Sequence, residues 1–170
     1  MTAPPSTRIR ALTDADDDVA LGRELVREYA IATAEEMTPP GGSPARELEK
    51  IMPHFPDWHD FESRYLRGGA FLIATTGDGV AGCVGVTPVD RLACEMNRLW
   101  VRPAFRRMGV ARCLVMSSLD EARRLGFRAM TLDALSTRTR AIALYRALGF
   151  EDAPSLHRYD FDVVSLGRRL

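Results

Sequence analysis

The sequence predicts one domain of mixed α/β class, in which helices flank a mixed, mostly antiparallel sheet. The pattern of apolar residues changes from helical spacing to strand-like alternation at Gly69. Two β-rich segments, residues 70–75 and 80–87, are separated by Thr76-Gly77-Asp78-Gly79, a strong hairpin signal. Beyond residue 92, strand and helix patterns alternate. Together these observations predict a hairpin followed by strand–helix–strand–helix–strand.

The N-terminal part is expected to form one short strand and two helical stretches. Residues 8–12 form the strand, and residues 1–7 are expected to be a flexible terminus. A cluster of four aspartates, at positions 14, 16, 17 and 18, suits a helix start because carboxylates interact favourably with its unpaired N–H groups. This helix runs to about Glu36, and residues 38–44 (TPPGGSP) form a loop. A second helix runs from about Ala45 toward Ile51 and is predicted to resume after Pro56.

The C-terminal part alternates strands and helices. A strand over residues 92–101 is halted by Pro103. Residues 110–125 form a helix with a broad apolar stripe, closed by Gly126. A strand over residues 128–133 and a helix over residues 141–148 follow. Residues 157–166 supply one or two last strands.

Composition indicates an ordinary globular protein. The 170 residues are 46% apolar and 27% charged, enough for a sizeable core without metal or disulfide. The 23 basic residues equal the 23 acidic ones, so no global charge favours a nucleic-acid or membrane partner. Cys83, Cys94 and Cys113 lie in apolar segments and are interpreted as buried thiols of a reducing compartment. Without a signal peptide or an apolar run of bilayer length, a cytoplasmic location is expected.

Residues with a recognisable chemistry concentrate between Glu95 and Gly126. Arg106-Arg107-Met108-Gly109-Val110-Ala111 joins a strand to the start of a helix. Unpaired N–H groups at a helix start bind phosphate oxygens, and small residues let a pyrophosphate approach the backbone. Arg106, Arg107 and Arg112 add positive charge. The segment is neither a Walker loop nor a dinucleotide fingerprint, and alone it equally fits an ordinary basic turn.

Two segments together resemble the GNAT acetyltransferase superfamily. The family's coenzyme signature, Gln/Arg-x-x-Gly-x-Gly/Ala, corresponds here to Arg106, Gly109 and Ala111, preceded by RLWVRPAF. ALYRALGFE at residues 143–151 is similar to the second signature, Leu-Tyr-x-x-x-Gly-Phe, and LDAL at residues 132–135 looks like a strand end of one bacterial subgroup. The close resemblance covers about residues 95–151.

The resemblance implies acetyl-CoA as co-substrate, no metal, and a sheet whose two central strands splay apart. In the family the coenzyme's pantetheine arm enters between these strands and pairs with the first of them, and its pyrophosphate lies on the following turn. The implied coenzyme-binding residues are Leu99, Trp100, Val101, Arg106, Arg107, Met108, Gly109, Val110, Ala111 and Arg112. One departure is Arg138, which stands where many members have an asparagine. Arg138 or Arg140 either reaches a phosphate or is solvated.

The resemblance also implies direct attack of an amine on the thioester. Tyr145 is the candidate acid for the leaving thiolate, with packing on an apolar helix face as the alternative. Glu95 is the candidate base; the alternative is an ion pair with Arg98 or another arginine. Asp133 is a weaker candidate base, with a polar cap near residues 136–137 as its alternative.

The acceptor is predicted only as a small-molecule or peptide amine. Phe55, Trp58 and Phe61 either line its pocket or pack in the core. His54, His59 and His157 form no site by their spacing and are interpreted as surface or loop residues. A homodimer is left open by the resemblance. The alternative function is a catalytically silent domain that binds acyl-CoA as a sensor or scaffold.

Overall fold

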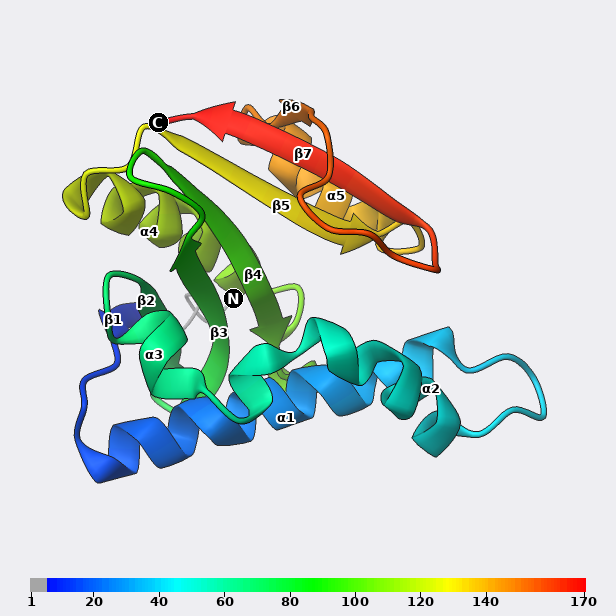
Figure 1. Ribbon diagram of the computed structural model, residues 1–170. Coiled ribbons are helices and arrows are strands. Elements are labelled where there is room, and N and C mark those ends of the chain that lie inside the picture. Colours follow the sequence, from blue (N-terminus) through cyan, green and yellow to red (C-terminus); the bar gives the residue numbers. More distant parts are fainter. Residues whose placement is uncertain (1–5) are drawn as a thin grey trace.

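The computed structural model describes residues 6–170, which form a seven-stranded sheet with helices on both faces (Figure 1). The strands are β1 (Arg8–Ala11), β2 (Ala70–Thr76), β3 (Gly79–Pro88), β4 (Ala93–Val101), β5 (Ala129–Leu135), β6 (Glu151–Asp152) and β7 (Val163–Arg169). The helices are α1 (Asp16–Met37), α2 (Pro44–Ile51), α3 (Phe61–Tyr65), α4 (Val110–Arg124) and α5 (Thr139–Ala147). Of the terminus predicted to be flexible, residues 1–5 lie outside the described residues.

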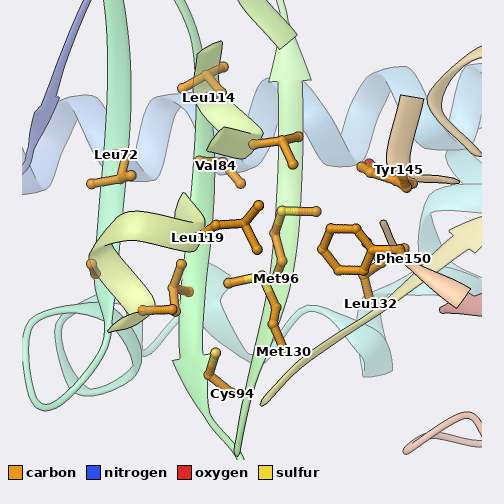
Figure 2. Close-up of a cluster of buried hydrophobic side chains, with 14 of the residues drawn as sticks. Leu72, Val84, Cys94, Met96, Leu114, Leu119, Met130, Leu132, Tyr145 and Phe150 are labelled. Atoms are coloured by element: carbon orange, nitrogen blue, oxygen red, sulfur yellow. The ribbon is translucent and has the colours of Figure 1, made fainter. Parts of the chain in front are cut away.

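The sheet has the order β1-β2-β3-β4-β5-β7-β6, and within it only β4 and β5 are parallel. The predicted mixed, mostly antiparallel sheet is therefore confirmed. It separates two cores because successive side chains of a strand point to opposite faces. Leu72 and Ala74 of β2 face α4 and α5, whereas Phe71 and Ile73 face α1, α2 and α3. Figure 2 shows the first core, where the α4 leucines lie against Val84 and its neighbours.

Two predicted elements differ in the structure. The helix predicted to resume after Pro56 does so only at Phe61, as the short α3: before it lie 3-10 turns at Met52–His54 and Pro56–Trp58, because the prolines interrupt helical hydrogen bonding. The last strand begins at Val163, so His157 lies in a loop between β6 and β7. In that loop the His157 N–H donates to Ser155 Oγ at 3.2 Å, a local bond that competes with strand pairing.

Two expectations from composition, buried cysteines and no apolar segment of bilayer length, can be compared with the structure. Cys83 and Cys94 are buried as predicted, but Cys113 is exposed because it falls on the outer face of α4. Among the described residues, no helix combines the length and apolar character that crossing a membrane requires.

The β4–β5 pair is short, and this positions the site. Pairing covers only Ala93–Glu95 against Ala129–Thr131. A bulge follows in β4, where two residues, Arg98 and Leu99, lie opposite Val84 of β3. Arg98 takes a left-handed backbone conformation there, with φ 53°. Because a bulge bends and twists its strand, β4 turns away from β5, and the predicted splayed strands are present.

Candidate active site

A cavity of about 840 Å³ opens where β4 and β5 separate. One wall is β4 from Met96 to Val101; the opposite wall is formed by the end of β5 and by α5, and α1 contributes Tyr29 and Glu36. Small-molecule sites typically have volumes of about 300–1,000 Å³, so this cavity lies in the upper part of that range. The splay therefore produces a space suited to a large ligand.

The structure brings half of the predicted coenzyme-binding residues to this cavity. The lining includes Leu99, Trp100, Val101, Arg106 and Ala111. Four others lie exposed in the adjoining turn and the first turn of α4: Arg107, Met108, Gly109 and Arg112. The side chain of Val110 is buried in the core, so only its backbone is available to a ligand.

The turn before α4 has the features of an anion site. Gly109 (φ 80°) begins α4, and no side chain caps the helix. Arg107 adopts φ 67°; with Arg98 it is one of two non-glycine residues of positive φ in the described chain. Such strained conformations cluster at functional sites. The Arg106 guanidinium lies 5.0 Å from the Trp100 ring, and its Nε donates to the Val101 carbonyl at 3.1 Å. Its two terminal nitrogens point to no carboxylate among residues 6–170.

A carboxylate–histidine cluster lies where the pairing of β4 with β5 ends. Glu95 is 9% exposed, and its Oε1 is 2.9 Å from Nε2 of His157. Three atoms that could bind a metal ion, a carboxylate oxygen each of Glu95 and Asp133 and a ring nitrogen of His157, lie within 4.8 Å of one another. Like charges this close repel each other, and a cation placed between the two carboxylates would offset that repulsion. The expectation that His157 is a mere surface or loop residue is therefore incomplete: it lies in a loop and is exposed, but it contacts the candidate base.

The alternatives offered for the two carboxylates are wrong. Glu95 does not pair with an arginine; Arg98 pairs with Asp57 instead. Asp133 accepts hydrogen bonds from Ser155 Oγ, at 2.8 Å, and from Ser165 Oγ, not from residues 136–137. Tyr159 belongs to the same group, because burial first, and then the negative charges of Asp133 and Glu95, raise the pKa of its phenol. The loop between β6 and β7 thus completes the cluster.

Arg98 is anchored by residues that the sequence did not single out. Its Nε and Nη2 donate to the two oxygens of Asp57 at 2.8 and 2.7 Å, and Nη2 also donates to the His54 carbonyl at 2.7 Å. Asp57 is fully buried and accepts a further bond from the Tyr65 hydroxyl at 2.7 Å. Burial acts to raise the pKa of Asp57, but the hydrogen bonds and charge of Arg98 outweigh it, and the pKa is lowered. This buried network holds the β4 bulge.

Tyr145 both packs and faces the cavity, so its two hypotheses are compatible. Tyr145 is 6% exposed and lines the large cavity, and the centre of its ring lies 6.0 Å from that of Phe150. Burial raises the pKa of its phenol, which keeps the hydroxyl protonated at neutral pH. Figure 2 shows Tyr145 beside Phe150 and Leu132 at the edge of the core.

Arg138 follows neither of its predicted alternatives. It is neither solvated nor left free for a phosphate: its guanidinium donates to Glu36 at 2.9 Å, to the Tyr29 hydroxyl at 2.7 Å and to Thr33 at 2.8 Å. These contacts join the start of α5 to α1 in the wall of the large cavity, which Tyr29, Glu36 and Arg138 line. Arg140 lines the cavity and is exposed.

The candidate acceptor aromatics separate into different environments. Phe61 is fully buried against Tyr65 and Phe71, and Trp58 is half-buried with the Arg27 guanidinium 5.7 Å from its ring. Only Phe55 borders a second, smaller cavity. His59 is exposed, in line with its prediction, whereas His54 is half-buried and lies 4.7 Å from the Tyr159 ring.

The family model of the acetyltransferase (GNAT) family matches residues 22–150. The chain belongs to this family. An uncharacterized N-acetyltransferase of Schizosaccharomyces pombe is 39% identical over 85 residues, which cover 49% of this chain and 52% of that protein. N-acetyltransferase 8 of Homo sapiens is 35% identical over 102 residues, 56% of this chain and 45% of that protein. The matches thus span about half the length of these curated relatives.

The family's fold extends over nearly the whole chain. The PaiA N-acetyltransferase of Thermoplasma acidophilum, solved in complex with coenzyme A, superposes with a TM-score of 0.73 at 15% identity. The superposition covers 97% of this chain and 99% of that one. At this level of identity the likeness establishes the fold, and the predicted GNAT architecture is confirmed.

Proposed function

We propose that this chain is an N-acetyltransferase that moves the acetyl group of acetyl-CoA to a primary amine by direct attack. The observation that carries the proposal is the cavity between the splayed strands. It has an uncapped helix start and free arginines at one end, and it reaches Asp133, a member of the carboxylate–histidine cluster, at the other. Family membership and the fold of a relative solved with coenzyme A support it.

Several features of this chain fit the co-substrate. Beyond Glu95 the edge of β4 that faces β5 has no strand partner, so its backbone groups are available to an extended ligand. The N–H groups of residues 107–111, with Arg106 and Arg112, would hold the pyrophosphate. Acetyl-CoA supplies the acetyl group as a thioester.

Two proton movements are required when the new C–N bond forms and the C–S bond breaks. Glu95, alone or through a water, would take the proton of the amine, with Asp133 as the weaker candidate. Tyr145 would give a proton to the departing thiolate. Met96 faces the α4–α5 core with Tyr145, and Glu95, its neighbour in the strand, faces the opposite side. Acid and base would therefore act from opposite faces of the sheet on a group held in the gap.

Tyr145→Phe should lower kcat by between about 10- and 100-fold, the cost of losing one hydrogen bond to a developing charge. Acetyl-CoA binding should change little, because only the hydroxyl is removed. Coenzyme release followed by a thiol reagent, at several pH values, measures the effect. An unchanged kcat at every pH would remove Tyr145 from the role of acid.

Arg106→Ala should weaken acetyl-CoA binding about 10-fold by removing one phosphate-facing charge. Calorimetric titration with acetyl-CoA measures the dissociation constant. Arg123→Ala is the matched control, because Arg123 is an exposed arginine at the far end of α4. Equal affinity in the two variants would argue against a phosphate at this turn.

The experiment that tests the function itself is acetyl-CoA turnover with a broad panel of amines. Amine-dependent release of coenzyme A supports the transferase. Tight acetyl-CoA binding with no amine-dependent release from any member of the panel would instead indicate a silent sensor or scaffold.

A further inference from the structure

A small cavity of about 70 Å³ lies on the α1 side of the sheet, between α1, the turn at Met52–His54 and the loop before β7. Its surface is about equally polar and apolar: the rings of Phe55, Tyr159 and Phe161 line it together with polar groups of Thr33, His54, Arg98 and Asp133. A cavity needs about 10–15 Å³ of this kind of space for each water-sized atom, so this one has room for about five or six non-hydrogen atoms. That is the size of a benzene ring or a short branched alkyl group.

The small cavity is adjacent to the large one, because Tyr29, Arg98 and Asp133 line both. Asp133 also belongs to the carboxylate–histidine cluster, within 4.8 Å of the Glu95 and His157 ligand atoms. A molecule seated in the small cavity could therefore place a polar group beside Asp133 and so close to the carboxylate–histidine cluster.

The charges around the small cavity favour a cation and disfavour an anion. Arg98 is the one arginine or lysine in its lining, and its guanidinium is already bound bidentately by Asp57 at 2.7–2.8 Å. Burial lowers the pKa of His54, which leaves this ring neutral at neutral pH. A carboxylate placed here would find no free arginine or lysine in the lining and would lie beside Asp133.

We infer that the acceptor is a compact primary amine with an apolar or aromatic body and no carboxylate beside the amine. Its ammonium group would lie at the carboxylate–histidine cluster, and its body would fill the small cavity against Phe161 and Tyr159. The inference rests on the proposed function and narrows it to one class of amine. It excludes free α-amino acids, because their carboxylate is adjacent to the amine, and long polyamines, because a cavity of about 70 Å³ is too small for their chain.

The test compares acceptors that differ in one group. Phenethylamine and phenylalanine share a ring and differ in the carboxylate; ethylamine lacks the ring; spermidine carries extra charges. We expect kcat/KM for phenethylamine to exceed that for phenylalanine by about 100-fold or more, since the carboxylate of phenylalanine would be repelled by Asp133. It should exceed that for ethylamine by at least about 10-fold, from the burial of the ring.

Three outcomes would overturn the inference in distinguishable ways. Turnover that is best with phenylalanine or spermidine would leave the transferase intact and reject this acceptor class. Activity lost in EDTA and restored by a divalent metal would assign the cluster of Glu95, Asp133 and His157 to a metal ion rather than to the ammonium. Acetyl-CoA binding without release for any amine would reject the proposed function and the inference with it.

A substitution in the cavity wall gives a second measurement. Phe161→Ala should raise KM for phenethylamine about 10-fold and leave KM for acetyl-CoA and for ethylamine unchanged. Leu156→Ala is the matched control, because Leu156 belongs to the same loop, is 47% exposed and lines neither cavity. Equal KM values for phenethylamine in the two variants would place the ring elsewhere. The acceptor panel uses the unaltered protein and decides the inference even if Phe161→Ala folds poorly.

Discussion

Asp57→Ala is expected to lower the free energy of unfolding by about 3–5 kcal/mol, the usual cost of removing one partner of a buried ion pair. Asp57 is fully buried, and its partner Arg98 has only 13% of its side chain exposed. The substitution leaves the guanidinium inside the protein with a single carbonyl acceptor, the one of His54. Urea denaturation followed by circular dichroism measures the change.

An exposed ion pair provides the control for this prediction. Asp120 pairs with Arg123 at 2.8 Å on the surface of α4, with 79% of the aspartate side chain exposed. Asp120→Ala should change stability little, because solvent screens such pairs. Similar losses in the two variants would show that burial does not strengthen the Asp57 pair. Asp57→Ala combined with Arg98→Ala should recover part of the loss, since no unpaired charge then remains buried.

The same pair predicts a dependence on pH. The pKa of Asp57 is lower in the folded protein than in the unfolded chain, so the folded state favours the ionised form. The contribution of ionised Asp57 to the free energy of unfolding is therefore complete above the pKa of the unfolded chain, about 3.9. It is lost as the pH falls through the lower pKa of the folded protein. The stability difference between the wild type and Asp57→Ala should be constant near neutral pH and shrink in acid. A difference that grew in acid would contradict the sign of this shift.

The sheet and the anion-binding turn were predictable because each leaves a local trace. Alternating apolar residues around a Gly-Asp-Gly turn specify a hairpin, and the stripe on residues 110–125 specifies a helix that covers the sheet. The turn at residues 106–111 is likewise contained in one short segment. Such signals need no knowledge of which distant segments meet.

The rest of the site depends on contacts without a local trace. Glu95 and His157 are 62 residues apart, and Arg98 and Asp57 are 41 apart. The bulge also misleads pattern reasoning: in an unbroken strand Arg98 would point to the same face as Met96, whereas here it points to the side of Asn97 and contacts Asp57. An unbroken strand would put Arg98 on the face opposite Glu95, so alternation gave no support to that pair, and no spacing indicated His157.

Glu95→Gln is expected to lower kcat/KM by about 100-fold or more, the effect of removing a general base. Glutamine has the size of glutamate and still offers an oxygen near His157, but it cannot accept a proton. The loss should be largest at low pH, where most of the acceptor amine is protonated and needs a base. It should diminish as pH approaches the amine pKa of about 10, where the neutral amine enters unaided.

Rate profiles measured from about pH 6 up to the amine pKa of about 10 separate this role from a structural one. Glu49→Gln serves as the control, because Glu49 is an exposed carboxylate on α2 that lines none of the cavities. Asp133→Asn distinguishes the second candidate: a pH-dependent loss there, with none in Glu95→Gln, would transfer the role of base to Asp133. A loss in Glu95→Gln that is equal at every pH and accompanied by a lower melting temperature would assign Glu95 to holding the loop of His157. Because Glu95 stands where the pairing of β4 with β5 ends, a role as base requires a loss in Glu95→Gln that is largest at low pH, without a lower melting temperature.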